Sequence, residues 1–214
     1  SHADCHRSIP DIHDGLKPSQ RKIIFSCFKK SMKDEMKVSQ LAGYVGEHSS
    51  YHHGENSLNG AIIALAQDFV GSNNINLLIP SGQFGTRLMG GKDSSSPRYI
   101  FTKLSHITSL IFREADFGIL DYLNDDGFQI EPRYYNPIIP LILVNGTKGI
   151  GTGWSSNLPC YNPLEVISCI ENKINDKEFS NLSPWYRHFE GNVLFDKTNY
   201  ITKGKYTING AFDI

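Results

Sequence analysis

The sequence predicts an α+β fold in which three helices precede a β-hairpin. Three segments, at about 18–32, 37–46 and 55–70, carry apolar residues at the spacing of one helix face. A short polar stretch separates the second segment from the third, as in a helix-turn-helix motif. Strand-like residues follow at LLIP (77–80) and RYIFTKL (98–104), on either side of a glycine-rich segment. Three helices and a hairpin in this order predict a winged helix.

Local signals support each of the three helices. Pro18 suits the first turn of the first helix, and we expect Gly71 to end the third. The buried faces that the spacing predicts are Ile23, Ile24, Cys27, Phe28 and Met32, then Val38, Leu41, Ala42 and Val45, then Leu58, Ala61, Ile62, Leu65 and Phe69.

The second half of the chain predicts a different arrangement. We expect a short helix at HITSLIF (106–112), a buried strand at LILV (141–144) and a glycine-rich loop at 147–159. Asn162 and Pro163 then suit the cap and first position of another helix, whose apolar face is Val166, Ile167, Ile170 and Ile174. Beyond about residue 176 the composition changes, which indicates the start of a second α/β subdomain. We place the glycine-rich loop with this second part and divide the chain into 1–144 and 145–214. The strand-like end GKYTINGAFDI predicts that the chain is a piece of something longer.

Composition indicates a globular protein. The 214 residues are 39% hydrophobic and 20% charged, with no apolar run near the roughly 18 residues that span a membrane. No signal peptide is visible, and no internal repeat occurs. Cys5, Cys27, Cys160 and Cys169 show no CxxC spacing, which favours scattered free thiols in a reducing compartment.

The charge is unevenly distributed, although the net charge is only −1. Residues 1–40 hold eight Lys or Arg against five Asp or Glu, and residues 81–105 hold four against one. Residues 114–131 hold six acids and no base. A near-neutral chain of this kind is compatible either with two basic patches and an acidic face or with ordinary surface charge.

Two motifs invite a functional interpretation that the residues alone do not support. The GxGxG spacing within 147–159 is a weak nucleotide-binding signal, because no helix starts directly after it and no P-loop Lys-Ser/Thr is present. His48, His52 and His53 are close in sequence, but no cysteine or carboxylate completes a convincing set of metal ligands, so we predict no metal site.

Seven blocks in uninterrupted order make the sequence similar to a known family. They are HRSIP, DGLKPSQRKIIFSCFKK, QLAGYVGEHSSYHHGENSL, AQDFVGSNNINLL, GQFGTRLMGGKDSSSPRYIFTKLS, PIIPLILVNGTKGIGTGWSSNLP and PWYRHFEG. Together they resemble the DNA breakage-reunion region of eukaryotic DNA topoisomerase II, a type IIA topoisomerase, over residues 4–193. The resemblance implies a winged-helix domain that holds a gate segment of double-stranded DNA, followed by part of a tower domain.

The resemblance also implies the chemistry. The family's nucleophile is the tyrosine of PRYIF, here Tyr99, which forms a 5′-phosphotyrosyl link with DNA. A phenol, with a pKa of about 10, is a poor nucleophile at neutral pH and needs help. Arg98 is suited to stabilise the transition state, and His53 to hydrogen-bond the scissile phosphate. On a regular strand Arg98 and Tyr99 would point to opposite faces, so both reach one phosphate only if the backbone turns or Arg98 curls back.

Other positions match the family's DNA surface. Ile150 corresponds to an isoleucine that wedges between base pairs and bends the duplex. The expected contacts to DNA are otherwise Arg7, Lys17, Arg21, Lys22, His52, Ser57, Asn145 and Lys148. The basic ones among them should contact phosphates rather than read sequence.

The family also implies partners that this chain does not supply. Mg²⁺ would be held by a Toprim domain and ATP by an N-terminal domain, and neither is visible here, so the chain alone is expected to be inactive. A homodimer and a nuclear location are family expectations, and no membrane partner is expected. The alternative is a non-catalytic winged-helix DNA-binding module. A tyrosine recombinase or type I topoisomerase is a third class, which the collinear match disfavours.

Overall fold

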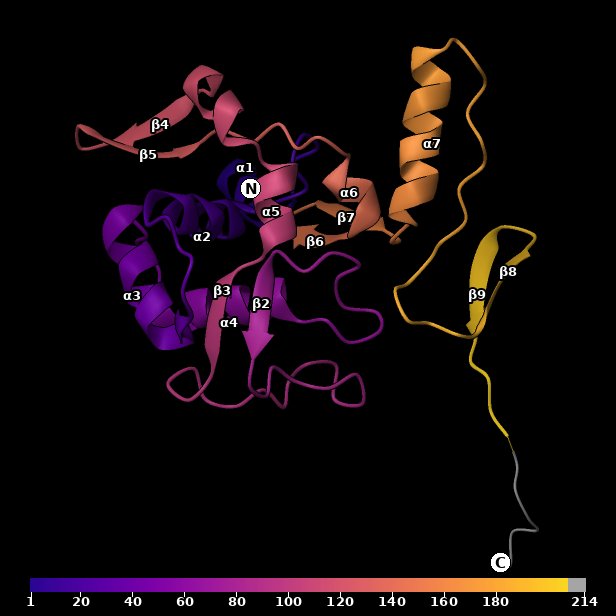
Figure 1. The fold of residues 1–214 in the computed structure, drawn as a ribbon, viewed down its shortest axis with the longest axis horizontal. Coiled ribbons are helices and arrows are strands. Elements are labelled where there is room, and N and C mark those ends of the chain that lie inside the picture. Colours follow the sequence, from indigo (N-terminus) through magenta and orange to yellow (C-terminus); the bar gives the residue numbers. More distant parts are fainter. Residues whose placement is uncertain (208–214) are drawn as a thin grey trace, which may run out of the picture.

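The computed structural model describes residues 1–207, which form a mixed α/β fold (Figure 1). The helices are α1 (His2–Ser8), α2 (Pro18–Lys29), α3 (Val38–His48), α4 (Glu55–Ala66), α5 (His106–Ile111), α6 (Leu141–Val144) and α7 (Pro163–Ile174), with a 3₁₀ helix at Glu114–Ile119. The strands are β1 (Met36–Lys37), β2 (Leu78–Ser81), β3 (Phe101–Leu104), β4 (Tyr122–Asp125), β5 (Phe128–Pro132), β6 (Thr147–Gly151), β7 (Trp154–Leu158), β8 (Asn192–Asp196) and β9 (Asn199–Lys203). Within this part of the chain no helix is long and apolar enough to cross a membrane.

Helices α2, α3 and α4 pack around the main core, as the sequence predicts. All four residues of the predicted α3 face are buried, and Ile23, Ile24 and Cys27 of α2 are inaccessible to solvent. Pro18 is the first residue of α2, as expected. Helix α4 ends earlier than predicted, because the chain leaves helical geometry at Gln67 and not at Gly71. Phe69 consequently lies beyond the helix and is only partly buried.

The predicted hairpin forms and gains a third strand. Strand β3 pairs antiparallel with β2 on one side and with the short β1 on the other, so the sheet order is β1-β3-β2. Thr102 at its centre is fully buried, and its hydroxyl donates to the Ile79 carbonyl at 2.8 Å. The segment between β2 and β3, residues 82–100, contains the Arg98-Tyr99 pair.

The prediction of a buried strand at LILV is wrong, because these residues form the single-turn helix α6. The backbone N–H groups of Leu143 and Val144 both bond to the Pro140 carbonyl, and that of Asn145 bonds to the Leu141 carbonyl. A four-residue apolar run can be a strand or a buried helical turn, so its composition does not decide between them. Leu141 and Val144 are buried, as expected of an apolar run.

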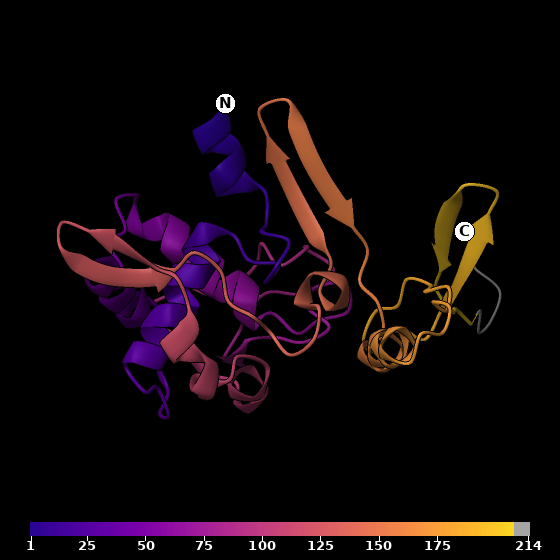
Figure 2. The ribbon, with the colours of Figure 1, turned by 90° about the horizontal axis from the view of Figure 1, so that it is seen from above.

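The prediction of a loop at 147–159 is also wrong, because the segment is a β-hairpin. Strands β6 and β7 pair over five positions, from Thr147 opposite Leu158 to Gly151 opposite Trp154. The connection is the two-residue turn of Thr152 and Gly153, and Gly153 has φ +81°, which favours glycine. Figure 2 shows the hairpin projecting from the body of the protein, with α1 beside it.

Helix α7 begins as predicted: the Asn162 side chain accepts a hydrogen bond from the Leu164 N–H at 2.9 Å, and Pro163 is the first helical residue. Val166 is buried, but Ile174, expected on the apolar face, is 75% exposed. Beyond α7 the antiparallel hairpin β8–β9 lies at the end of the molecule opposite α3 (Figure 1). Of the strand-like end, residues 204–207 are irregular and residues 208–214 lie outside the described part.

Candidate nucleic-acid interface

Arg98 and Tyr99 lie in a turn that immediately precedes β3, and not on the strand itself. The Tyr99 N–H donates to the Ser96 carbonyl at 2.9 Å, which closes the turn. The Tyr99 side chain is 66% exposed. The Arg98 guanidinium carbon lies 4.8 Å from the centre of the Tyr99 ring, so the two side chains share one side of the turn. The turn therefore removes the geometric objection that alternation along a strand would raise.

The turn is fixed to the helical core on both sides. The N–H of Ser39 donates to the Pro97 carbonyl at 3.1 Å, and the N–H of Val38 donates to the Ile100 carbonyl at 3.0 Å. Both donors belong to the first turn of α3, whose N–H groups have no partner within the helix. Ile100, directly after Tyr99, is buried in the core. An exposed tyrosine is thus held at a defined position by a rigid helix start.

The glycine-rich segment before this turn is also ordered by hydrogen bonds. The Gln67 side-chain amide donates to the carbonyls of Phe84 and Gly91, at 2.8 and 3.2 Å. The Asp93 carboxylate accepts from the N–H and hydroxyl of Thr86, both at 2.8 Å, and these bonds lower the pKa of Asp93. A Cβ at Gly85 would lie 2.6 Å from the Gly91 Cα, so glycine is required for the close approach.

Several predicted DNA contacts meet in one groove of about 960 Å³ between α1, the start of α2, the α3–α4 connection and the β4–β5 hairpin. Its lining includes Arg7, Lys17, Lys22, His52, His53 and Ser57. His53 is exposed, and its ring makes an edge contact with Tyr51 at 5.4 Å between centroids. These residues come from distant parts of the sequence and converge because α4 begins beside α2.

His52 has a partner that sequence reasoning missed. Its Nε2 lies 3.3 Å from the Asp125 carboxylate on the β4–β5 hairpin. Hydrogen bonds from Ser50 and His52 lower the pKa of Asp125. The two residues are 73 positions apart, and no local pattern in the sequence indicates the contact.

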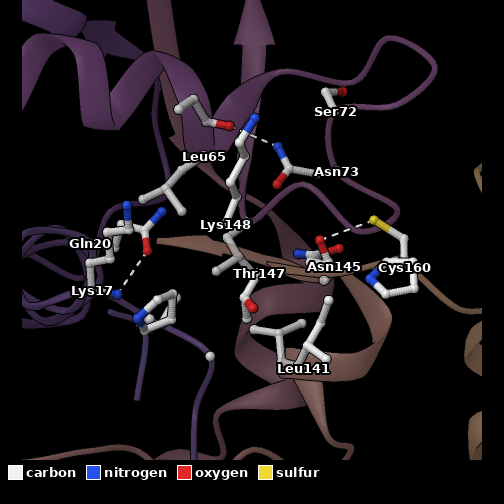
Figure 3. Close-up of a pocket in the computed structure, with 18 of the residues that line it drawn as sticks. Lys17, Gln20, Leu65, Ser72, Asn73, Leu141, Asn145, Thr147, Lys148 and Cys160 are labelled. Carbon is white, nitrogen blue, oxygen red and sulfur yellow. Dashed lines mark hydrogen bonds between the residues drawn. The ribbon is translucent and has the colours of Figure 1, made fainter. Parts of the chain in front are cut away.

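A second hollow, of about 540 Å³, adjoins the groove, because Lys17 and Ser19 line both. Figure 3 shows Lys17 and Lys148 among its lining residues, with Asn73 and Asn145. Two lysines on one continuous concave surface suit the tracking of phosphates along a duplex. Among the described residues, the linings of these two hollows include neither Arg98 nor Tyr99.

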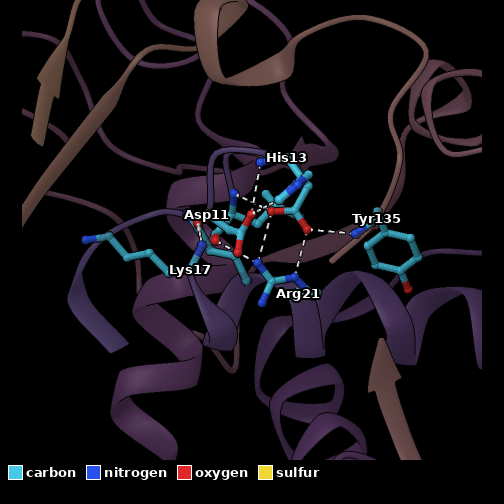
Figure 4. Close-up of polar contacts among 8 residues, drawn as sticks. Asp11, His13, Lys17, Arg21 and Tyr135 are labelled. Carbon is cyan, nitrogen blue, oxygen red and sulfur yellow. Dashed lines mark hydrogen bonds and ion pairs between the residues drawn. The ribbon is translucent and has the colours of Figure 1, made fainter. Parts of the chain in front are cut away.

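Arg21 requires a correction, because it does not have the free guanidinium of a phosphate contact. Its side chain is buried and bonds the carboxylate of the fully buried Asp14 through two nitrogens, at 2.7 and 2.9 Å. Asp14 also accepts from the N–H groups of Leu16 and Tyr135. Figure 4 shows Arg21 directed into this network, close to Tyr135. The position indicates a structural ion pair.

Lys22 and Asn145 are also engaged internally. The Lys22 ammonium lies 2.8 Å from the buried Glu131 carboxylate and donates to the Ser49 carbonyl. The Asn145 amide exchanges two hydrogen bonds, both of 2.8 Å, with the backbone of Ile75. Each residue lines a hollow, yet its polar atoms are used by the fold, so direct DNA contact does not fit either position.

Ile150 fits its predicted role in position. It lies on β6 next to the turn, opposite Ser155, and is 75% exposed. Lys148 lies two residues before it and therefore on the same face of the hairpin. An exposed isoleucine at the end of a projecting hairpin has no packing explanation within the described residues.

Comparisons with known proteins identify the class of protein. The sequence model of the DNA gyrase/topoisomerase IV A-subunit family matches residues 7–214, and the chain belongs to this family. Over the whole chain it is 56% identical to DNA topoisomerase 2 of Arabidopsis thaliana and 54% identical to that of Drosophila melanogaster. It spans about 14% of the length of each of these relatives.

A solved structure agrees with the sequence relatives. The crystal structure of the Plasmodium falciparum topoisomerase II DNA-binding, cleavage and re-ligation domain matches with a TM-score of 0.94 at 54% identity. The match covers 97% of this chain and 29% of that one. The resemblance to eukaryotic DNA topoisomerase II that the sequence indicates is therefore confirmed.

Proposed function

We propose that this chain is the part of a type II DNA topoisomerase that binds, cuts and reseals a gate duplex so that a second duplex can pass. The proposal rests mainly on Tyr99, which is exposed and lies beside the Arg98 guanidinium. Both residues stand on a turn that is hydrogen-bonded to the start of α3. A tyrosine that only packed a core would be buried. Membership of the topoisomerase family supports the same conclusion.

The cleavage step is a transesterification, in which no atom is oxidised or reduced. The Tyr99 phenol loses its proton, its oxygen attacks a backbone phosphorus, and the P–O bond to the 3′ oxygen breaks. The departing oxygen takes a proton and becomes a 3′ hydroxyl, and the 5′ phosphate stays on Tyr99. Attack of that hydroxyl on the phosphotyrosine reverses the reaction, so the phosphodiester is restored without an external energy source at this step.

The proposed role of Arg98 is to stabilise the transition state. Negative charge accumulates on the non-bridging phosphate oxygens as Tyr99 attacks, and a guanidinium can bind two of them at once. His53 would hydrogen-bond the scissile phosphate.

The proposed path of DNA follows the groove and the adjoining hollow. We infer that α2, α3, α4 and the β1–β3 sheet act as a winged helix, with Ser57 at the start of α4 and His52 in the preceding connection toward the duplex. Arg7, Lys17 and Lys148 contact phosphates, and Ile150 enters between base pairs to bend the duplex. Arg21, Lys22 and Asn145 support this surface from within.

The remaining family features are proposals about a longer protein. Among residues 1–207, no group of three or more His, Cys, Asp or Glu side chains could hold a metal ion. The described residues thus do not fit a Mg²⁺ site, and no step above is routed through one. We propose that Mg²⁺ and ATP are bound by other domains, that residues 145–214 begin a tower domain, and that the enzyme works as a homodimer in the nucleus.

Trapping the covalent intermediate tests the proposal. In the full-length protein with supercoiled DNA, Mg²⁺ and denaturant quenching, we expect Tyr99→Phe to abolish protein-linked DNA while retaining affinity for DNA. Arg98→Lys should form the link at least tenfold more slowly at similar affinity. Undiminished cleavage by Tyr99→Phe would remove Tyr99 as the nucleophile. Binding without any covalent product in the unchanged protein would instead favour a non-catalytic winged-helix module.

A further inference from the structure

Helix α1 is hydrogen-bonded to the turn of the β6–β7 hairpin. One oxygen of the Asp4 carboxylate accepts from the backbone N–H of Thr152 at 2.8 Å and from its hydroxyl at 2.9 Å. The Cys5 thiol donates to the Thr152 carbonyl at 3.4 Å. Thr152 follows Ile150 by two residues, so these contacts hold the part of the hairpin that carries the proposed wedge.

Two glycines of β6 let the helix approach this closely. A Cβ at Gly149 would lie 2.5 Å from the Ser8 carbonyl oxygen, and one at Gly151 would lie 3.1 Å from both the Cα and the sulfur of Cys5. Both lack a side chain on the hairpin face that meets α1, while Ile150 and Lys148 occupy the other face. One face of the hairpin therefore packs against α1, and the other face carries Ile150 and Lys148.

Helix α1 packs mainly against β6, with a smaller contact to α2, and none of its residues is fully buried. A seven-residue helix without a buried face has little intrinsic stability in water. The contact between α1 and the hairpin turn consists mainly of the hydrogen bonds to Asp4. The second oxygen of the Asp4 carboxylate accepts from the Arg7 guanidinium at 3.1 Å. The hydrogen bonds from Thr152 and Arg7 lower the pKa of the Asp4 carboxyl, in keeping with its acting as a charged acceptor.

We propose that Asp4 is a positioning residue for DNA bending, which holds the hairpin of Ile150 through Thr152. This inference rests on the proposed function, in which Ile150 enters the duplex. A side chain that enters between base pairs exerts a reaction force on the hairpin, and an isolated two-stranded hairpin is only marginally stable. The Asp4 carboxylate opposes that force through its two hydrogen bonds from Thr152.

The test measures DNA bending in the full-length protein, by fluorescence resonance energy transfer across a duplex of about 30 base pairs labelled at both ends. Asp4→Ala removes both hydrogen bonds and should shift the bent-to-unbent ratio about fivefold toward unbent DNA at saturating protein. Thr152→Val removes only the bond from the hydroxyl and should give a smaller shift in the same direction. The double variant should do no more than Asp4→Ala alone, because the hydroxyl of Thr152 has no other partner in this contact once Asp4 is removed. Thr152→Ser keeps the hydroxyl and the N–H and should bend as the unchanged protein does.

Three controls make the result specific. Asp68→Ala removes an exposed carboxylate outside this contact and should leave bending unchanged. Arg7→Ala should weaken binding and its salt dependence by about one phosphate contact, yet bend normally once saturated. An unchanged thermal midpoint for Asp4→Ala excludes unfolding as the cause, and the exposed position of α1 predicts that result.

The outcomes separate this inference from the function on which it rests. If Ile150→Ala loses bending while Asp4→Ala bends normally, the positioning role is refuted and the wedge stands. If Asp4→Ala behaves as Arg7→Ala does, with normal bending at saturation, Asp4 serves only the phosphate contact and the proposal is wrong. If Ile150→Ala itself bends DNA normally, the wedge fails, and the positioning role fails with it.

Discussion

Replacement of Arg21 by methionine should destabilise the fold rather than weaken DNA binding. Arg21 is 3% exposed and its partner Asp14 is fully buried. Methionine has a comparable apolar stem but cannot donate a hydrogen bond. The substitution leaves the Asp14 carboxylate buried with two backbone N–H donors and no countercharge.

The size of the effect follows from that geometry. Breaking a buried ion pair by removing one partner costs about 3–5 kcal/mol, because a buried charge remains unpaired. Domains are stable by roughly 5–15 kcal/mol, so the loss is a large share of the total. For a chain of this size it corresponds to a drop in the melting temperature on the order of 10 °C. Arg21→Lys keeps the charge but loses the two-pronged bond, so we expect a smaller loss.

Urea unfolding of the chain, followed by circular dichroism, measures the free energy directly, and salt-dependent DNA binding supplies the second readout. We expect Arg21→Met to lower the unfolding midpoint and to leave the salt dependence of binding by the folded protein unchanged. The reasoning fails if the midpoint is that of the unchanged chain while the salt dependence falls by one phosphate contact. That pair of results would make Arg21 a DNA contact, as the sequence alone suggests.

Two further predictions concern stability and reactivity. Burial raises the pKa of the Cys27 thiol from 9.0 to about 12, so iodoacetamide at pH 8 should modify Cys5 and spare Cys27 until denaturant is added. The same shift should make the free energy of unfolding fall as pH rises from 9.0 toward about 12, because the Cys27 thiol ionises at lower pH in the unfolded chain than in the folded one. An unfolding midpoint that does not change with pH in this window would contradict the prediction. Asn162→Ala should cost about 1 kcal/mol of stability, because the Leu164 N–H at the start of α7 loses its acceptor, and an unchanged urea midpoint would show that water replaces the cap.

Helical periodicity and capping are local, and they predict most of the helix faces and starts, although α4 ends before Gly71 and Ile174 of α7 is exposed. The face of α3, the start of α2 at Pro18 and the Asn162 cap need only neighbours within a few residues, whereas Met32 of the predicted α2 face lies beyond the end of that helix at Lys29. The misread segments lack such local signals. LILV is too short to show a period, and β6–β7 hides its alternation because Gly149 and Gly151 replace the side chains of one face.

The sequence by itself determined the family, the mixed fold and the identity of the candidate nucleophile, because long collinear blocks and helical spacing are properties of the chain order. The tertiary structure decided which charges are available to a partner. In the sequence Arg21 and Lys22 cannot be told from the other basic residues, but in the folded chain each forms an ion pair with a buried carboxylate, Asp14 and Glu131 respectively. Only the folded chain joins Asp4 to Thr152, 148 positions away, because distant segments meet only through packing and hydrogen bonding.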